Sequence, residues 1–169
     1  MGLESLVYPI LGDRVILGKT REEAHKPASG KYNGYGGKPN LGEPILDCAC
    51  RELKDESGLI ALPEDLIYRA YIQFFMFGAK EPSHSVAIFL VKKFSGELVD
   101  THEMKEHKPF LISNPQFNLM LPTDKFFLPI VLDLEQKGFS GWMRFSENRR
   151  SVDDHHFKPY LKDLNTLRV

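Results

Sequence analysis

Residues 37–59 read GKPNLGEPILDCACRELKDESGL, and this stretch decides how the rest of the chain is interpreted. Glu43 and Pro44 predict the start of a helix, because an acid suits the positive end of the helix dipole and proline is tolerated in the first turn. Gly58 predicts the end of the helix, since glycine readily takes the left-handed conformation that follows one. The stretch is therefore expected to form one helix that follows the glycine-rich segment 33–37.

The predicted helix carries three acids on one side. At about 100° per residue, Glu52, Asp55 and Glu56 fall within one arc of about 100°. Carboxylate oxygens suit Mg²⁺, which usually binds one or two of them and completes its shell with water and phosphate oxygens. Small or apolar residues occupy a separate arc, which predicts that the helix buries one side: Leu46, Ala49, Cys50 and Leu53.

Acidic residues on a helix are most often simply exposed to solvent, and this interpretation competes with a metal site. The spacing of Gly37, Glu43 and Gly58 around the acids favours the metal site. The Gly36–Gly37 pair would let the backbone approach a metal or a phosphate closely, because neither residue carries a side chain.

Arg51 and the two cysteines of the helix are given structural roles. Arg51 lies one turn from both Asp47 and Asp55, so it is expected to pair with acids beside the cluster. Cys48 and Cys50 lie two positions apart, where helical side chains point in different directions, so we expect two reduced thiols and no disulfide.

The composition is typical of a soluble globular protein, with 169 residues, 42% hydrophobic and 27% charged, and a mean hydropathy of −0.29. A net charge of −1 and a pI near 6.6 leave no basic excess for binding a nucleic-acid polymer or a membrane surface. The N-terminus shows no signal peptide, and no apolar run of about 18 residues occurs. We therefore expect one cytoplasmic domain over residues 1–169; no pattern in the sequence indicates its oligomeric state.

Alternating and continuous apolar runs predict strands on both sides of the helix. A turn at Gly12–Asp13 separates the first two strands, and a loop is expected from Thr20 to Gly30. A second helix is expected over Pro122–Gln136, where Pro129 either kinks the helix or marks its first turn. This order predicts an α/β protein built in layers. The predicted strands are Leu6–Ile10, Arg14–Leu17, Leu66–Phe77, Ser85–Phe94, Lys108–Ile112, Phe139–Phe145 and Val152–Phe157.

Residues 37–59 resemble the Nudix box, whose pattern is Gly, five residues, Glu, seven residues, Arg-Glu-apolar, one residue, Glu-Glu, one residue, Gly, apolar. Only Asp55 departs from it, by one methylene and with its charge kept. The resemblance implies the Nudix fold, an α/β/α sandwich with a mixed β-sheet. The matching residues are Gly37, Glu43, Arg51, Glu52, Leu53, Asp55, Glu56, Gly58 and Leu59.

The chain as a whole is similar to the MutT-like branch of this family, which includes the animal oxidised-purine nucleoside triphosphatases. The resemblance implies that Asn33 contacts the base and that Glu103 is a fourth acid near the metals. Gly37 is placed beside the metal because a glycine lets the backbone approach closely, and Lys38 either contacts a phosphate or is simply exposed. Glu52, Glu56 and Glu103 are then the candidate catalytic acids, and either Glu103 or Glu52 is the general base.

Departures from this branch fall where the base would be bound. Leu121 stands where the branch has a stacking tryptophan, and Thr123 replaces the first of two aspartates, whereas Asp124 keeps the second. Pro27 lies near the place of a loop aromatic. We expect weaker recognition of a modified purine, because stacking area and one hydrogen-bonding acid are lost.

The resemblance implies a hydrolase that depends on Mg²⁺, with Mn²⁺ as a substitute, and that cleaves nucleoside triphosphates to the monophosphate and pyrophosphate. Its partner would be a small-molecule nucleotide, taken from a pool that includes damaged bases. Three alternatives remain open. They are hydrolysis of a nucleotide sugar or other nucleoside diphosphate derivative, a Nudix-fold binding module without catalysis, and RNA 5′-end processing, which the absence of a basic patch disfavours.

Overall fold

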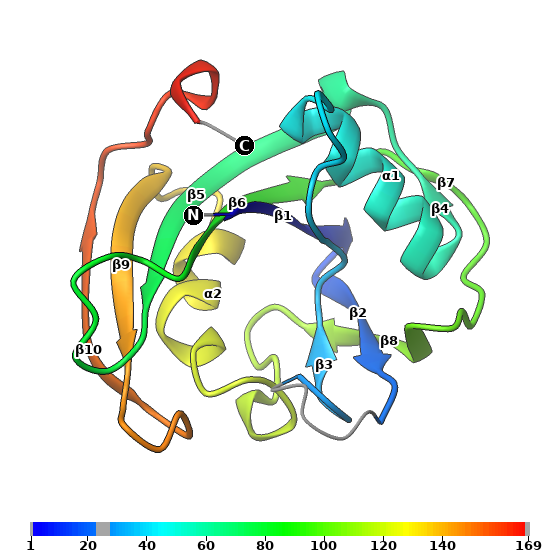
Figure 1. The fold of residues 1–169 in the computed structure, drawn as a ribbon. Coiled ribbons are helices and arrows are strands. Elements are labelled where there is room, and N and C mark those ends of the chain that lie inside the picture. The colour runs from blue at the N-terminus through cyan, green and yellow to red at the C-terminus, as the bar shows by residue number, and fades with distance from the viewer. Residues whose placement is uncertain (1, 23–27, 168–169) are drawn as a thin grey trace.

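The computed structural model describes residues 2–22 and 28–167, which form an eight-stranded sheet with helices on its two faces (Figure 1). The strands of this sheet are β1 (Gly2–Leu11), β2 (Arg14–Thr20), β3 (Tyr32–Asn33), β5 (Leu66–Phe75), β6 (His84–Val91), β8 (Met104–Leu111), β9 (Phe139–Phe145) and β10 (Val152–Lys158). Two short strands, β4 (Leu59–Ile60) and β7 (Ser95–Gly96), pair with each other apart from the sheet. The α-helices are α1 (Ile45–Ser57) and α2 (Asp124–Leu132).

The sheet is mixed. Its strand order is β10–β9–β5–β6–β1–β2–β3, and β8 also pairs with β2. Strand β1 runs parallel to β6 and β5 runs parallel to β9, whereas β1–β2, β5–β6 and β9–β10 are antiparallel. The expected combination of an α/β fold and a mixed sheet is confirmed.

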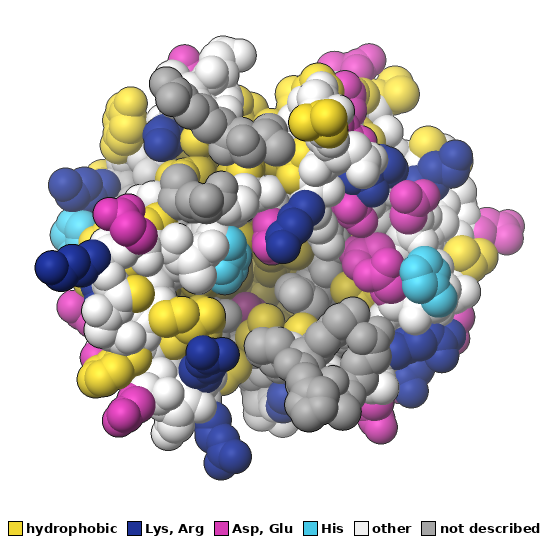
Figure 2. All heavy atoms as spheres, in the orientation of Figure 1, with side chains coloured by type: hydrophobic (Ala, Val, Ile, Leu, Met, Phe, Trp, Pro, Cys, Tyr) yellow, Lys and Arg dark blue, Asp and Glu magenta, His cyan; other side chains and the backbone are white. Residues whose placement is uncertain are grey.

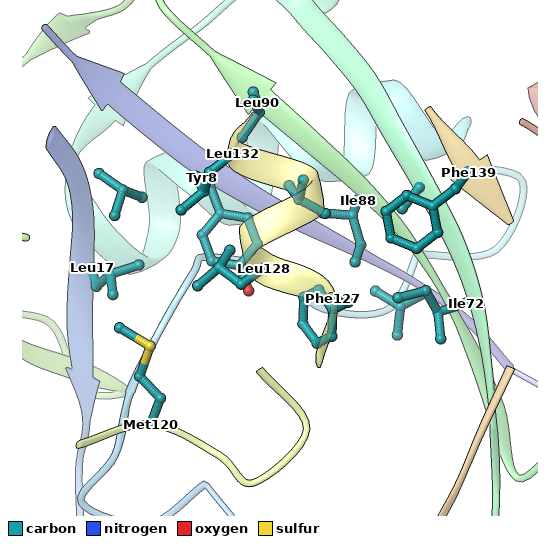
Figure 3. Packing of buried hydrophobic residues seen from close by; sticks show 14 of the residues in the cluster. Tyr8, Leu17, Ile72, Ile88, Leu90, Met120, Phe127, Leu128, Leu132 and Phe139 are labelled. Atoms are coloured by element: carbon teal, nitrogen blue, oxygen red, sulfur yellow. The ribbon is translucent and has the colours of Figure 1, made fainter. Parts of the chain in front are cut away.

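Two hydrophobic cores lie on opposite faces of the sheet, as the alternation of side chains along a strand requires. In β1, Tyr8 and Ile10 belong to the core that includes α2, whereas Leu3 and Val7 belong to the core that includes α1. Figure 3 shows Leu128 of α2 beside Tyr8 in the first of these cores. The α/β/α sandwich is therefore confirmed.

Helix α1 matches the prediction from residues 37–59. Pro44 directly precedes its first residue, and Gly58 ends it with a φ of 80°, in the left-handed region. The Gly58 N–H donates to the Lys54 carbonyl at 2.8 Å, which satisfies one of the helix's last carbonyls.

Helix α2 is shorter than predicted. It spans Asp124–Leu132 and not Pro122–Gln136, and Pro129 lies inside it, so the idea that Pro129 marks the first turn is wrong. The Arg69 guanidinium donates hydrogen bonds to the backbone carbonyls of residues 130, 131, 133 and 136. These carbonyls therefore have a donor although the helix ends at Leu132. Local sequence gave no sign of this distant partner.

Strand boundaries differ from the prediction where side chains are polar or pairing is short. Strand β8 begins at Met104, before the predicted Lys108, because its polar residues lie on an edge strand and show no apolar pattern. Strands β5 and β6 end at Phe75 and Val91, earlier than predicted. Strands β4 and β7 were not predicted, since two-residue strands leave no periodic signal.

The loop expected from Thr20 to Gly30 is described only in part. Thr20 is the last residue of β2, and a turn is present at residues 28–30. Residues 23–27, which include Pro27, lie outside the described residues. Within residues 2–22 and 28–167, no helix has the length and hydrophobicity needed to cross a bilayer.

Candidate active site

Helix α1 fixes its acids by burying its opposite side. Ala49 and Leu53 are fully buried in the core that the helix shares with the sheet. Glu56 is also buried, with 6% of its surface exposed, which is uncommon for a carboxylate. Figure 2 shows a hollow near the centre of one face of the molecule, with acidic side chains gathered beside it.

The glycine-rich segment lies directly against these acids. The Gly36 N–H donates to Oε2 of Glu56 at 2.7 Å. A Cβ on Gly36 would collide with the backbone of Ser5, and a Cβ on Gly37 would lie 2.6 Å from Oε1 of Glu52. The two glycines therefore allow the loop to fit between β1 and the carboxylates of α1.

The placements of Gly37 and Lys38 limit their roles. The Gly37 carbonyl accepts a hydrogen bond from the Ser5 N–H at 2.8 Å, so this oxygen is already bound to β1, and the glycine serves chiefly to make room for Glu52. The Lys38 side chain is 74% exposed, and its Nζ lies 4.0 Å from a carboxylate oxygen of Glu4. This ammonium is free to move toward a bound anion.

Arg51 connects the start of the box to its acids. Its Nε and one terminal nitrogen each donate to Glu43 at 2.8 Å, and its other terminal nitrogen donates to Oε1 of Glu52 at 2.8 Å. The hydrogen bonds from Arg51 lower the pKa of Glu43 to about 2. These contacts place Arg51 where it can orient Glu43 and Glu52, and its structural role stays a prediction. Its ion pairs are with Glu43, Glu52 and, at 3.8 Å, Asp55, and the predicted pairing with Asp47 is replaced by Glu43.

Arg51→Lys is expected to lower kcat by about 10- to 100-fold while the fold is retained, since orienting residues around metal sites have effects of this size. A lysine offers one point charge and does not hold Glu43 with two parallel bonds while also holding Glu52. The readouts are kcat and the Mg²⁺ concentration giving half-maximal rate, which should rise. In a Glu43→Gln, Arg51→Lys double variant the two losses should not add, because Glu43 reaches Glu52 only through Arg51. Wild-type kinetics in Arg51→Lys would refute this role.

The ionised form of Glu56 is electrostatically unfavourable when no cation is bound nearby. Burial raises its pKa to about 8, although the hydrogen bond from Gly36 opposes the rise. The charges of Glu52, Glu103 and Asp55 raise this pKa further. A divalent cation among these carboxylates would offset both the burial and the repulsion, and oxygen donors are the ones Mg²⁺ prefers. The donor set therefore fits Mg²⁺.

Glu103 and Asp55 lie at the exposed side of the cluster. Their side chains are 52% and 59% exposed, and Oε1 of Glu103 lies 3.1 Å from Nε2 of His102. Within residues 2–22 and 28–167, no three Asp, Glu, His or Cys side chains converge closely enough to form a preassembled metal site. The acids nevertheless share one region, since the charges of Glu52, Asp55 and Glu103 all act on Glu56.

The residues implied in base binding begin helix α2 or lie in the glycine-rich segment. Asp124 is buried and accepts hydrogen bonds from the Leu121 N–H and the Thr123 hydroxyl, both at 3.1 Å. Burial raises the pKa of Asp124 to about 7. Oδ1 of Asn33 accepts from the Gly34 N–H at 2.8 Å. These hydrogen bonds hold the side chains of Asp124 and Asn33 in place through residues that are close to them in the sequence.

Tyr8 was not predicted as part of this region. Its ring lies under the loop, because a Cβ on Gly34 would be 2.8 Å from Tyr8 Cε1. Burial raises the pKa of Tyr8, and the charge of Asp124 raises it further. The Tyr8 hydroxyl is buried and has no hydrogen-bond partner among the described residues. Figure 3 shows this hydroxyl beside Leu128. Sequence reasoning placed residues 6–10 in a strand, and a tyrosine in a strand is most often a core residue.

His84 is a second residue that sequence reasoning did not identify. Its ring stacks on Phe74 with centroids 4.9 Å apart and planes 7° apart. Burial lowers the pKa of His84; the charge of Glu4 opposes this change, and the charge of Lys38 adds to it. Phe74 itself belongs to the α2 core.

Sequence comparison matches this chain to a known family over most of its length. The model of the NUDIX domain matches residues 5–127. The oxidized purine nucleoside triphosphate hydrolase of Danio rerio is 32% identical over 143 residues, which cover 85% of this chain and 86% of the relative. The oxidized purine nucleoside triphosphate hydrolase of Mus musculus is 32% identical over 146 residues, which cover 86% and 87%.

Solved structures share the fold at lower identity. The mutator MutT protein of Bacillus halodurans superposes with a TM-score of 0.78 at 18% identity and covers 95% of this chain and 99% of its own. A MutT NUDIX hydrolase of Burkholderia pseudomallei superposes with a TM-score of 0.64 at 20% identity, covering 77% and 97%. At these identities the superpositions support the fold alone.

Proposed function

The chain belongs to the NUDIX family and is a Nudix hydrolase, and on that premise we propose that it cleaves nucleoside triphosphates to the monophosphate and pyrophosphate. We propose further that its substrates include oxidised purine nucleoside triphosphates, so that it removes damaged nucleotides from the pool. The names of the two animal relatives support this substrate class, and they match most of this chain.

The observation that carries the proposal is the environment of Glu56. A buried carboxylate is bound by the Gly36 N–H and surrounded by the charges of Glu52, Asp55 and Glu103. A structural role alone would place hydrophobic or paired groups there, because uncompensated burial of a charge is costly. Binding of a cation and of a polyphosphate accounts for the arrangement.

Each acid is assigned a role. Glu56 and Glu52 would hold Mg²⁺, with Asp55 in support, and Arg51 fixes the carboxylate of Glu52. When bound, Mg²⁺ neutralises charge on the phosphates and favours loss of a proton from water. Glu103 is assigned as the base that accepts this proton, because its side chain is half exposed whereas that of Glu52 is held by Arg51.

A substrate panel tests the proposed function. Nucleoside triphosphates, nucleotide sugars, dinucleoside polyphosphates and 5′-triphosphorylated RNA are incubated with Mg²⁺, with Mn²⁺ and with EDTA, and the products are separated. The expected result is monophosphate plus pyrophosphate from triphosphates, with activity in either metal and none in EDTA, while the circular dichroism spectrum is unchanged. Preference for another substrate class would overturn the proposal, and binding without any hydrolysis would identify a non-catalytic module.

Base discrimination is expected to be weaker than in the animal relatives. Leu121 offers less flat area than a tryptophan, and the hydroxyl of Thr123 does not replace a carboxyl group beside Asp124. Each missing contact costs about 1–3 kcal/mol of discrimination, so the preference for 8-oxo-dGTP over dGTP is expected to fall by about 10-fold or more.

The measurement is the ratio of kcat/KM for 8-oxo-dGTP and dGTP in the wild type and in a Leu121→Trp, Thr123→Asp double variant. The ratio should rise in the double variant. Leu121→Trp alone serves as the control, because Thr123 is buried and its replacement also changes the contact with Asp124. A wild type that already prefers the oxidised base about a thousandfold, with no gain in the variant, would show that other residues read the base.

A further inference from the structure

A groove with a volume of about 450 Å³ lies on the part of the sheet that α1 leaves uncovered. Its floor is formed by β5, β9 and β10, and one wall is formed by the segment that follows β10. Strands β9 and β10 lie at the end of the sheet away from α1 (Figure 1). This groove is separate from the acids of α1 and from the base-binding residues near α2.

The floor is built from two rows of paired residues. Trp142 of β9 pairs in register with Gln73 of β5 and His156 of β10. The next row on the same face pairs Ser140 with Tyr71 and with Lys158. Because strands lie about 4.8 Å apart, these rows form a flat surface three strands wide.

Aromatic rings in the groove are held in place and partly available. Tyr71 is only 5% exposed, and its ring belongs to the core beneath the groove. Trp142 is half-buried and packs edge-to-face with Phe75, with centroids 6.2 Å apart. The guanidinium of Arg144 lies over both Phe75 and Trp142. The indole is thus supported from one side while it lines the groove on another.

Two lysines give the polar rim of the groove a positive charge. Lys158, Lys162 and His156 line it, and its lining contains no Asp or Glu among the residues that the structure describes. Nζ of Lys162 lies 4.7 Å from the centroid of the Tyr71 ring, and the Lys162 N–H donates to the Ser140 hydroxyl at 2.8 Å. This bond anchors the wall to β9, so the Lys162 ammonium is held over the Tyr71 ring.

We propose that this groove binds a mononucleotide, with the base against Trp142 and the phosphate between Lys158 and Lys162. A flat ring combined with an anion matches an aromatic floor with ammonium groups at its rim. The volume lies within the range of about 300–1,000 Å³ that is usual for small-molecule sites. A nucleic-acid polymer is disfavoured, because the chain has a net charge of −1. The site lies outside the hydrolytic centre, and the proposal does not depend on the proposed function.

Trp142 is the only tryptophan of the chain, so intrinsic tryptophan fluorescence reports on this groove. The full-length protein is titrated with GMP or AMP in EDTA, which prevents hydrolysis and metal-dependent binding at the acids. The expected result is a saturable change in emission with a midpoint below about 1 mM. Guanosine, which lacks the phosphate, and inorganic phosphate, which lacks the ring, should each bind at least about 10-fold more weakly.

A Lys158→Gln, Lys162→Gln double variant should lose the saturable change, and a Glu56→Gln variant should keep it. Circular dichroism melting of the double variant establishes that it is folded, and Lys125→Gln, which removes a lysine outside the groove, is the matched control. No saturable change in the wild type, or an unchanged midpoint in a folded double variant, would overturn the proposal. Binding of a single-stranded oligonucleotide about 10-fold more tightly than GMP would overturn the assignment to a mononucleotide.

Discussion

Glu56→Gln is expected to reduce turnover by at least about 10³-fold at saturating Mg²⁺ while the protein stays folded. The substitution preserves shape and an acceptor for the Gly36 N–H but removes one metal-binding charge. The like charges of Glu52, Asp55 and Glu103 then face a group that stays neutral at every pH. Because the pKa of Glu56 is about 8, the melting temperature without divalent cations should equal that of the wild type near pH 7 and exceed it above pH 8. Loss of activity together with unchanged or higher stability distinguishes a functional acid from a structural one.

The readouts are single-turnover rates and thermal melts with and without Mg²⁺. Mg²⁺ should raise the melting temperature of the wild type, because it binds the native state, and this rise should disappear in Glu56→Gln. Asp47→Asn is the matched control, since Asp47 is an exposed acid on the same helix and lies outside the ion pairs of Arg51. Near-wild-type turnover in Glu56→Gln would refute the assignment of this acid.

Arg69→Met is expected to destabilise the protein by about 3–5 kcal/mol, which is the range for breaking a buried charged network. Arg69 is 6% exposed, and its guanidinium donates to four backbone carbonyls at the end of α2 and just beyond it. The shortest of these bonds, 2.7 Å, is to the carbonyl of Asp133. Methionine fills a similar volume but leaves these carbonyls without their donor, and helix-end carbonyls have no partner within the helix.

The measurement is chemical unfolding by urea, supported by thermal melts in which the midpoint should fall by about 10 °C or more for a chain of this size. The stability of Arg69→Lys should lie between that of the wild type and that of Arg69→Met, because an ammonium supplies fewer donors in a less suitable geometry. Arg14→Met is the surface control, since the Arg14 side chain is 47% exposed and its ion pair among the described residues is with exposed Asp13 at 3.7 Å. Equal stability of Arg69→Met and the wild type would show that the end of α2 does not depend on this side chain.

The sequence by itself determined the elements whose signals are local. Pro44 and Gly58 bounded α1 because their backbone preferences act at the positions they occupy. The period of the helix placed Glu52 and Glu56 on one side, and the Nudix box supplied their expected chemistry. Long apolar runs predicted β5 and β6, since central strands are buried on both faces.

Only the tertiary structure decided which groups meet across the chain. Glu43 and Arg51 lie eight positions apart, and their pairing depends on the path of the loop before α1, which helical spacing does not encode. The end of α2 depends on Arg69, a residue of β5 that lies 62 positions before Val131 in the sequence. Strand β8 is polar because it lies on an edge, so no apolar period marked its start at Met104.

The same difference between local and tertiary signals explains why only one of the two proposed sites was predicted from the sequence. The acids of α1 were visible in the sequence because one helix presents them at a fixed period. The groove around Trp142 brings together β5, β9, β10 and the segment after them, and its residues follow no single period. A site on one helix can be predicted from residues that are close in the sequence. A surface formed by strands that are distant in sequence exists only once the pairing of those strands has set their order and register.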